Sequence, residues 1–332
     1  MHYERRKEAR FCDALSVIIP CYNPDPDRLY ACLESLAAVY PAPEIVMVDD
    51  GCDEPLTSAL RLPEGLGQPR ILRHAINRGP LDARRSGLLG ATRPYIHFVD
   101  ADDLVDVALY RALSGRDRLP DILTFRALNQ LEDGSETSRG QPEMDHTLLQ
   151  RAERVESFFG FRYLFSVWNK IYTRELAMQV HANLPTMLDL RFGEDFVFNA
   201  YAFWLAESHE HVETVGYRYC QHAAQVSASA SQEKMQQRLI ADQTTSMTTV
   251  LEFLLAQEPG KDRDTAVHAF SVREYHATMR LLQNTLGVTQ ATQIDEVAHL
   301  MDARLAVFAP WAREILRQRE RADGLQARIA DR

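Results

Sequence analysis

The stretch Tyr95-Ile96-His97-Phe98-Val99-Asp100-Ala101-Asp102-Asp103 joins a short, mainly apolar run to three aspartates. Such a run, stopped by charged residues, is typical of a buried β-strand that ends at the surface. Two earlier stretches repeat this order: residues 15–19 precede Pro20-Cys21-Tyr22-Asn23, and residues 44–48 precede Asp49-Asp50-Gly51. The sequence therefore predicts three strands that each end in a polar loop.

Amphipathic segments fill the gaps between these strands. Apolar residues at helical spacing predict helices over 27–39, near 55–61 and over about 80–91, and a further strand is expected at 70–73. Strands that alternate with helices form right-handed βαβ units, so we expect an α/β fold with a mainly parallel, twisted sheet flanked by helices. Ligands of such sheets bind beyond the carboxyl ends of the strands, here called the carboxyl edge. The polar loops are therefore expected to meet at one site.

Asp100 and Asp102 are the expected metal ligands of that site. Mg²⁺ and Mn²⁺ prefer carboxylate oxygens, and at phosphates they use one or two protein carboxylates plus the substrate. We expect Asp102 to bind the ion directly and Asp100 to hold a ribose or a coordinated water. Asp103 can instead cap the helix that follows. The plain alternative is that all three are solvated turn and cap residues, which their place on the same edge as Asp49 and Asp50 disfavours.

The loops after the other strands supply candidates for binding a nucleotide. Gly51 permits a turn that a Cβ would hinder, and a carboxylate of Asp49 or Asp50 can accept the imide N–H of uracil there. Asn77 offers a polar group near the same edge. Arg84 can pair with a diphosphate or brace an aspartate. An ordinary Asp-Gly turn and, for Arg84, a solvated helix face are the alternatives.

Glu194 and Asp195 precede a strongly apolar helical stretch, residues 196–201. Capping and the helix dipole both favour an acid at this position, which is the plain explanation. The chemical alternative is a general base, a carboxylate that removes the proton of an acceptor hydroxyl. His222 is a further candidate ligand for a metal or a diphosphate, although a lone histidine is more often structural.

The rest of the chain is mainly helical in pattern. A polar stretch over 126–145 with the turn signal Asp133-Gly134 predicts a hairpin or an excursion of the chain. Helical spacing resumes over 148–206, and a strand is expected near 211–219. Beyond about residue 231 only helices are expected. Large apolar residues of these helices are explained more simply as core than as acceptor contacts: Trp204, Leu251, Phe253, Leu254, Phe270, Leu281 and Leu282.

The last residues carry a loose heptad. Ile315, Ala322, Leu325 and Ile329 are spaced for one helix face, and several arginines accompany them. This pattern suggests a short coiled coil, a dimer contact or a helix docked on an anionic membrane surface, and a solvated tail explains it equally well.

Composition excludes several classes of protein. The chain has 332 residues, 45% hydrophobic and 25% charged, which is ordinary for a globular protein. A formal charge of -10 argues against a nucleic-acid partner, because phosphate binding needs a basic face. The five cysteines form no CxxC pair, so neither a zinc site nor a disulfide framework is indicated. The basic N-terminus is not followed by the apolar core of a secretory signal, and no stretch is long and apolar enough to cross a bilayer. We therefore expect a cytoplasmic protein, with peripheral contact to the inner face of the membrane as an option.

Taken in order, these segments closely resemble the inverting family 2 glycosyltransferases of the GT-A fold. The resemblance covers about residues 14–225 and rests on five motifs in order, LSVIIPCYN, IVMVDDG, NRG with AR before YIHFVDADD, VWNKIY and FGEDF. Cys52, Pro80 and Arg85 depart from the family's pattern, in loops near the diphosphate.

The resemblance implies a metal-dependent, hexosyltransferase-type enzyme that moves a sugar from a nucleoside-diphosphate sugar, expected to be a UDP sugar, to an acceptor hydroxyl with inversion. Asp195, with Glu194 beside it, would supply the base, and Asp100, Asp102 and His222 would hold Mn²⁺ or Mg²⁺. The residues implied for binding the nucleotide sugar are Pro20, Tyr22, Asn23, Asp49, Asp50, Asn77, Arg84, Asp100, Ala101 and Asp102. The implied acceptor is a glycan, a lipid-linked sugar or a protein, in the synthesis of cell-surface polysaccharide or glycoconjugate.

The motifs and the helical pattern of the C-terminal part also predict the domain boundaries. Residues 1–13 are a tail, 14–225 the GT-A domain, and 226–332 a helical C-terminal region. Within the GT-A domain, about 14–125 is expected to bind the nucleotide sugar and about 126–225 the acceptor.

Two rival functions stay open from the sequence. A sugar-1-phosphate nucleotidyltransferase has a similar sheet, but its glycine-rich, basic first loop is missing from Pro20-Cys21-Tyr22-Asn23-Pro24-Asp25. A dehydrogenase is disfavoured because no GxGxxG follows the first strand. The second rival is a non-catalytic nucleotide-sugar-binding subunit, against which the presence of both Asp100/Asp102 and Glu194-Asp195 argues.

Overall fold

The computed structural model describes residues 12–139, 150–186, 188–221 and 233–286. Its strands are β1 (Leu15–Cys21), β2 (Glu44–Asp49), β3 (Arg70–Arg73), β4 (Tyr95–Phe98), β5 (Leu104–Val105), β6 (Ile122–Gln130), β7 (Glu136–Ser138), β8 (Lys170–Thr173) and β9 (His209–Cys220). Its helices are the short η1 (Cys12–Ala14), then α2 (Pro26–Ala37), α3 (Leu56–Ala59), α4 (Pro80–Gly90), α5 (Val107–Leu113), α6 (Arg151–Phe159), α7 (Arg174–Asn183), α8 (Glu194–Leu205), α9 (Glu233–Leu255) and α10 (Lys261–Leu286).

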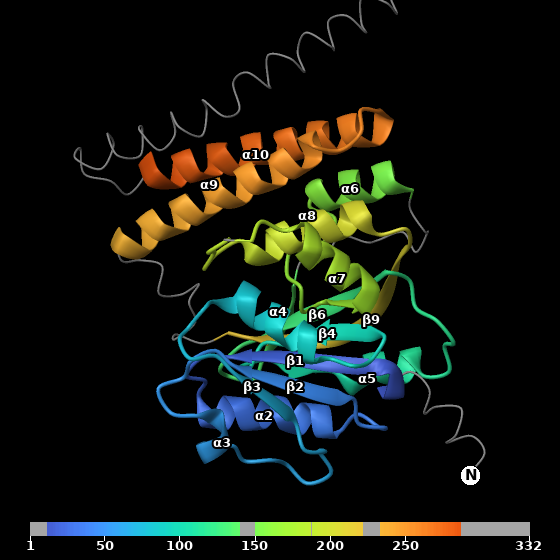
Figure 1. Ribbon diagram of the computed structural model, residues 1–332, viewed down its shortest axis with the longest axis vertical. Coiled ribbons are helices and arrows are strands. Elements are labelled where there is room, and N and C mark those ends of the chain that lie inside the picture. Colours follow the sequence, from blue (N-terminus) through green and yellow to red (C-terminus); the bar gives the residue numbers. More distant parts are fainter. Residues whose placement is uncertain (1–11, 140–149, 187, 222–232, 287–332) are drawn as a thin grey trace, which may run out of the picture.

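One sheet runs through the molecule in the order β3-β2-β1-β4-β8-β6-β9-β5, with β7 paired to β6. Figure 1 shows α2 and α3 on one face, α4, α7 and α8 on the other, and the α9–α10 hairpin as an outer layer beyond α8. Strands β1 to β4 pair in parallel, as predicted for the first part of the chain. The α/β architecture expected from the sequence is confirmed.

Beyond β4 the sheet is mixed. β8 pairs antiparallel with β4 and β6, whereas β9 pairs parallel with β6. The hairpin predicted over 126–145 is present as β6 and β7, and the predicted strand near 211–219 lies within β9. The continuous helical pattern expected over 148–206 is wrong at β8. Ile171 and Tyr172 are buried in opposite cores, so this strand shows no polar–apolar alternation that would reveal it.

Each face of the sheet has its own apolar core. Successive residues of a strand point to opposite faces. Val17 and Ile19 of β1 pack in one cluster with Leu33 of α2, and Ile18 packs in the other with Leu88 of α4. The first strands are therefore held from both sides, and the loops at the carboxyl edge start from fixed points.

The C-terminal hairpin shares the second core. Residues of α9 and α10 lie in the same cluster as Phe196 of α8, and Trp204, Leu251, Phe253, Leu254 and Phe270 are buried as expected. The side chains of Leu281 and Leu282 and the heptad over 315–329 lie outside the described residues, as does the expected boundary at 225. Within the described part of the chain, no helix is long and apolar enough to cross a membrane.

Candidate active site

The predicted acids and Arg84 meet at the carboxyl edge. Arg84 of α4 donates from Nη2 to Asp100 Oδ1 at 3.0 Å, and from Nη1 to Asp195 Oδ1 at 2.6 Å and Glu194 Oε1 at 3.1 Å. These four residues, the Arg84 cluster, come from α4, the loop after β4 and the first turn of α8. Two roles were predicted for Arg84, pairing with a diphosphate and bracing an aspartate. The geometry shows the second, because Arg84 holds three carboxylates in place. Pairing with a diphosphate would compete with three acids already bound.

Burial governs the electrostatics of the Arg84 cluster. Burial acts to lower the pKa of Arg84, but the charges of Asp195, Asp100 and Glu194 outweigh it and raise that pKa, so the guanidinium stays charged. Burial, with the neighbouring Asp195 charge, raises the pKa of Glu194 to about 7 against the opposing effect of Arg84. Burial also raises the pKa of Asp100. One fixed cation thus holds three acids, of which Glu194 is partly protonated near neutral pH.

Asp195 is held at both oxygens. Its Oδ2 accepts the backbone N–H of Val167 at 3.1 Å, opposite the oxygen that Arg84 holds. The segment before β8 that carries Val167 is fixed by Lys170, whose Nζ donates to the carbonyls of Leu164 and Ser166, each at 2.7 Å. Lys170 is fully buried, and burial lowers its pKa to about 7. No role was predicted for Lys170 from the sequence, although a charged residue within the mainly apolar segment VWNKIY could have indicated one.

Asn199 links the same segment to α8 from the other side. Its Nδ2 donates to the carbonyls of Phe165 at 2.7 Å and Asp195 at 3.0 Å, while its Oδ1 accepts from Tyr172. Asn199 lies one helical turn after Asp195, so it reinforces the start of α8. The candidate base is therefore positioned from two elements at once.

The paired acids after β2 fix the loops of the carboxyl edge. Asp49 accepts from the backbone of Cys52 at 2.9 Å and of Leu56 at 3.0 Å, and also from Arg73. Burial acts to raise the pKa of Asp49, but these hydrogen bonds outweigh it and lower that pKa. The expected contact with uracil would add to bonds that already use both oxygens.

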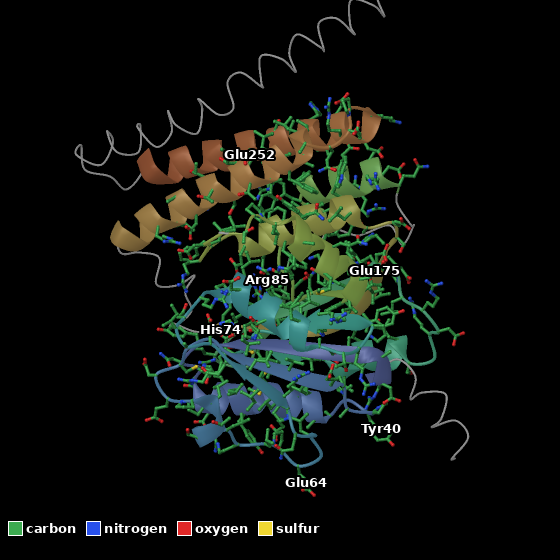
Figure 2. All side chains as sticks on the ribbon, in the orientation of Figure 1. Tyr40, Glu64, His74, Arg85, Glu175 and Glu252 are labelled. Carbon is green, nitrogen blue, oxygen red and sulfur yellow. The ribbon has the colours of Figure 1, made fainter. Side chains whose placement is uncertain are left out.

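Asp50 holds the loop that carries Asn77. Its oxygens accept the backbone N–H groups of Arg78 at 2.9 Å and Gly79 at 2.8 Å, and one of them lies 2.6 Å from His74 Nδ1. Figure 2 shows His74 at the end of the sheet where these loops gather. Gly51 has φ +75°, and a Cβ on it would lie 2.4 Å from the Ile76 carbonyl carbon, so only glycine allows this approach.

The end of β1, with Pro20, and the loop after it, with Tyr22 and Asn23, contribute to this edge. Tyr22 is 54% exposed and free of a core role. Asn23 bridges to the next loop: its Nδ2 donates to Asp53 Oδ2 at 3.0 Å and its Oδ1 accepts the Asp53 N–H at 2.9 Å. Beside this bridge lies a cavity of 250 Å³, lined by Asn23, Tyr30, Cys52 and Arg61 among others.

Asp103 differs from its two neighbours. It is fully buried and accepts from Tyr217 Oη at 2.8 Å and from the Cys220 N–H at 2.7 Å. Burial raises its pKa well above the usual value. The expectation that Asp103 caps a helix is wrong, because Asp106 caps α5 by accepting from Ala108 N at 2.8 Å. Its carboxylate instead ties the loop after β4 to β9, in the second half of the sheet.

The donor set for a cation consists of Asp100 and Asp102. Among the described residues, no group of three or more His, Cys, Asp or Glu side chains is placed to hold a metal ion. His222 lies outside those residues. Two carboxylates on one short loop suit Mg²⁺ or Mn²⁺ when a diphosphate supplies further oxygens. The chemistry of the loop therefore fits an ion that is bound together with a phosphate ligand.

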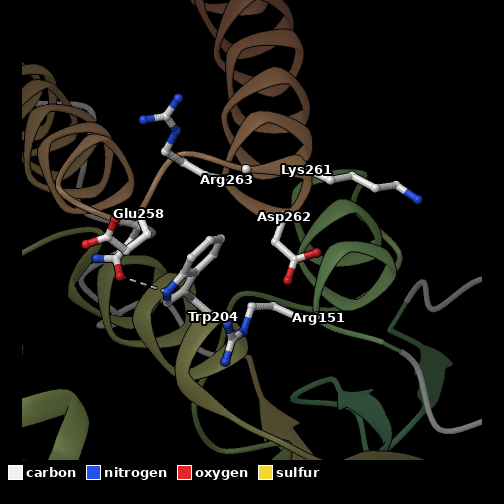
Figure 3. Close-up of a pocket in the computed structure, with 8 residues that line it drawn as sticks. Arg151, Trp204, Glu258, Lys261, Asp262 and Arg263 are labelled. Carbon is white, nitrogen blue, oxygen red and sulfur yellow. Dashed lines mark hydrogen bonds between the residues drawn. The ribbon is translucent and has the colours of Figure 1, made fainter.

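A second cavity lies away from this site, at the turn between α9 and α10. Its volume is 480 Å³, and its lining includes Arg151, Trp204 and Asp262. The Trp204 indole Nε1 donates a hydrogen bond to Gln257 Oε1 at 3.1 Å, which is the dashed line at Trp204 in Figure 3. None of the predicted site residues lines it.

Comparison with known proteins finds similarity to glycosyltransferases. Residues 16–174 match the model of glycosyl transferase family 2. The chain is 32% identical over 199 residues to the uncharacterised glycosyltransferase EpsJ of Bacillus subtilis (strain 168), and 30% identical over 198 residues to the uncharacterised glycosyltransferase YibD of Escherichia coli (strain K12). These matches cover 58% and 56% of this chain, and in both cases 57% of the relative, so the chain spans little more than half of their length.

A solved structure shares the fold. The crystal structure of S. aureus TarS residues 1–349 in complex with UDP-GlcNAc superposes with a TM-score of 0.64, at 17% identity, over 88% of this chain and 80% of that TarS fragment. At this identity the likeness concerns the fold, and it confirms the GT-A type expected from the sequence.

Proposed function

Because residues 16–174 belong to glycosyl transferase family 2, we propose that this chain transfers a sugar from a UDP sugar to an acceptor hydroxyl with inversion, as a hexosyltransferase-type enzyme. The observation that carries the proposal is the Arg84 cluster. It brings Asp195 and Glu194 of α8, which lie 111 and 110 positions after Arg84, to the Asp100 loop. TarS, of the same fold, was crystallised with UDP-GlcNAc, which supports the choice of donor class.

Asp195 is the general base of the proposed reaction. One oxygen takes the proton of the acceptor hydroxyl, whose oxygen attacks the anomeric carbon as the nucleoside diphosphate leaves from the opposite side. Arg84 and the Val167 N–H keep the carboxylate in place for this step. Glu194 is less suited, because its side chain is 12% exposed against 22% for Asp195 and is therefore less accessible to an acceptor.

Asp102 and Asp100 hold Mg²⁺ or Mn²⁺ in this proposal. The ion, when bound, supplies positive charge to the diphosphate oxygens as negative charge develops there. The loop keeps both carboxylates at the carboxyl edge, since Tyr217 binds Asp103 and the Asp100 backbone N–H. We extend the proposal to a glycan, lipid-linked or protein acceptor in cell-surface glycan synthesis, which rests on the sequence resemblance. A cytoplasmic location is also proposed, and it rests on the cysteine pattern and the N-terminal sequence.

The test is a screen of nucleotide sugars by thermal shift, with and without Mn²⁺, followed by hydrolysis and transfer assays. We expect one UDP sugar to stabilise the protein only when the metal is present. Asp195→Asn should bind that donor normally and lose about 10² to 10⁴ in rate, and Asp102→Ala should lose the metal-dependent part of binding. Full activity of Asp195→Asn would remove Asp195 from the mechanism. Tight donor binding without any turnover would point to a non-catalytic binding subunit.

A further inference from the structure

The proposed donor site is short of positive charge for a diphosphate. Arg84 is the cation that the sequence offered for this role, but its side chain is 7% exposed and three carboxylates surround it. Arg73 is bound to Asp49, and Arg78 pairs with Asp82 at 3.1 Å. A diphosphate needs charge-assisted donors, which are the strong hydrogen bonds of such sites.

Arg191 supplies a cation at the right place. It lies on the segment before α8, and its Nη1 donates to Asn77 Oδ1 across the site. Its Nη1 lies 3.4 Å from the point where a Cβ on Gly79 would be, so the guanidinium packs directly beside Gly79. The ion pair between Arg191 and Asp189 is long, with 3.7 Å between Arg191 Nε and Asp189 Oδ1. The Arg191 side chain is also 39% exposed, so it is accessible to a ligand.

Helix α9 holds the segment that carries Arg191. Asp242 is 3% exposed, and its Oδ2 accepts the backbone N–H groups of Arg191 at 2.9 Å and Phe192 at 3.1 Å. Its Oδ1 lies 2.8 Å from Arg238 Nε, so the buried charge is paired. Since Asp242 binds the backbone of Arg191, it sets where that side chain starts.

The same helix fixes the turn into α8. Gly193 has φ +81°, and a Cβ on it would lie 2.8 Å from Ser246 Oγ of α9. Glycine is therefore required there both by its conformation and by its close approach to α9. Glu194 and Asp195 directly follow Gly193. The contacts that α9 makes through Asp242 and Ser246 therefore position both Arg191 and the candidate base.

We propose that Arg191 binds the diphosphate of the donor, and that Asp242 of α9 is a positioning residue for it. The C-terminal hairpin is then part of the donor site. This inference rests on the proposed function, because it takes a nucleoside diphosphate as the ligand of the carboxyl edge.

Binding of UDP and of uridine, by calorimetry at constant Mn²⁺, tests the role of Arg191. Arg191→Gln keeps a hydrogen-bonding side chain and loses the charge. We expect UDP to bind about 10- to 100-fold more weakly and uridine to bind as before, since a hydrogen bond to a charged group is lost. Arg126→Gln is the matched control, because Arg126 is 41% exposed and also lies 3.7 Å from a carboxylate, that of Glu213.

Each result is decisive. Unchanged UDP affinity in Arg191→Gln overturns the inference and leaves the proposed function standing. An equal loss for UDP and uridine also overturns it, because the contact would not be with phosphate. A wild-type protein that binds no UDP at any metal concentration overturns the proposed function itself, and the inference with it.

Asp242→Ala tests the positioning role. We expect UDP affinity to fall about as far as in Arg191→Gln, with little further loss in the double variant, because the two residues act as one unit. Thr245→Ala on the same helix is the control, as its hydroxyl only bonds the Ala241 carbonyl at 3.0 Å. A merely structural role would lower the melting temperature and weaken uridine and UDP alike, and this result, or full additivity in the double variant, contradicts the proposal.

Discussion

Two regions of the chain build the carboxyl edge, and they reveal themselves differently in sequence. From β1 to β4, the acids of interest lie at the ends of their strands, as in Asp49-Asp50 and Asp100-Ala101-Asp102. In the second region, from β8 to α9, several of the supporting groups are buried inside regular elements. Lys170 lies inside a strand, and Asp242 lies within a long helix.

The difference has a physical cause. In the first region parallel strands end at one edge, so position along the chain already predicts position in space. In the second region several contacts are hydrogen bonds between a buried side chain and backbone groups, such as Lys170 with Ser166 or Asp242 with Arg191. A local sequence pattern does not predict the partners of such bonds. The comparison predicts that the residue joining the two regions matters most, and that residues within the second region matter less but measurably.

Arg84→Met should have the largest effect, because Arg84 joins the two regions. The change leaves Asp100, Glu194 and Asp195 without their common cation, and unpaired buried charge costs about 3 to 5 kcal/mol. We expect that loss in urea unfolding, and transfer activity at least about 10²-fold lower, since the base would be misplaced. Arg85→Met, at the next and exposed residue of α4 (Figure 2), is the control. Comparable stability and rate in both variants would mean that the two regions do not depend on the Arg84 cluster.

Lys170→Met should have an intermediate effect that is confined to the second region. The carbonyls of Leu164 and Ser166 lose their donor, at a cost of about 1 to 3 kcal/mol. Transfer should fall more than UDP binding, because the affected segment holds Asp195 and not the nucleotide loops. Lys261→Met, at an exposed lysine of α10, serves as the control in both assays. A variant that loses UDP affinity as strongly as rate would show that the segment supports the whole site.

Glu194→Gln should have the smallest effect at acidic pH, and one that grows as the pH rises. The folded pKa of Glu194 is about 7, above its usual 4.5. A raised pKa means that the stabilising contribution is present below about pH 4.5 and is lost as pH rises through 7. Glutamine stays neutral, so the variant should gain stability relative to the wild type over this range, by roughly 1 kcal/mol per pH unit at most.

Urea unfolding at several pH values checks this expectation. Glu175→Gln is a suitable control, since Glu175 is an exposed acid in the first turn of α7. Parallel curves for Glu194→Gln and the wild type between pH 4.5 and 7 would contradict the assigned environment of Glu194.

Much of the fold could be predicted, because strand–helix alternation and acids at strand ends are local patterns. The prediction failed at β8, whose residues are buried on both faces, and at Asp103, whose partners Tyr217 and Cys220 are more than a hundred residues away. The sequence identified Arg84 as a candidate. Whether it binds a diphosphate or braces acids could not be predicted, because that depends on three carboxylates from other segments.

The sequence by itself determined the parallel strands β1 to β4, the polar loops that follow them and the acids available for chemistry. Hydrophobic spacing and strand-end loops act over a few residues, so they are visible along the chain. Only the tertiary structure decided which acids share Arg84, how α8 presents Asp195, and that α9 reaches the site through Asp242. These depend on burial and on hydrogen bonds between distant segments, whose partners are chosen by packing.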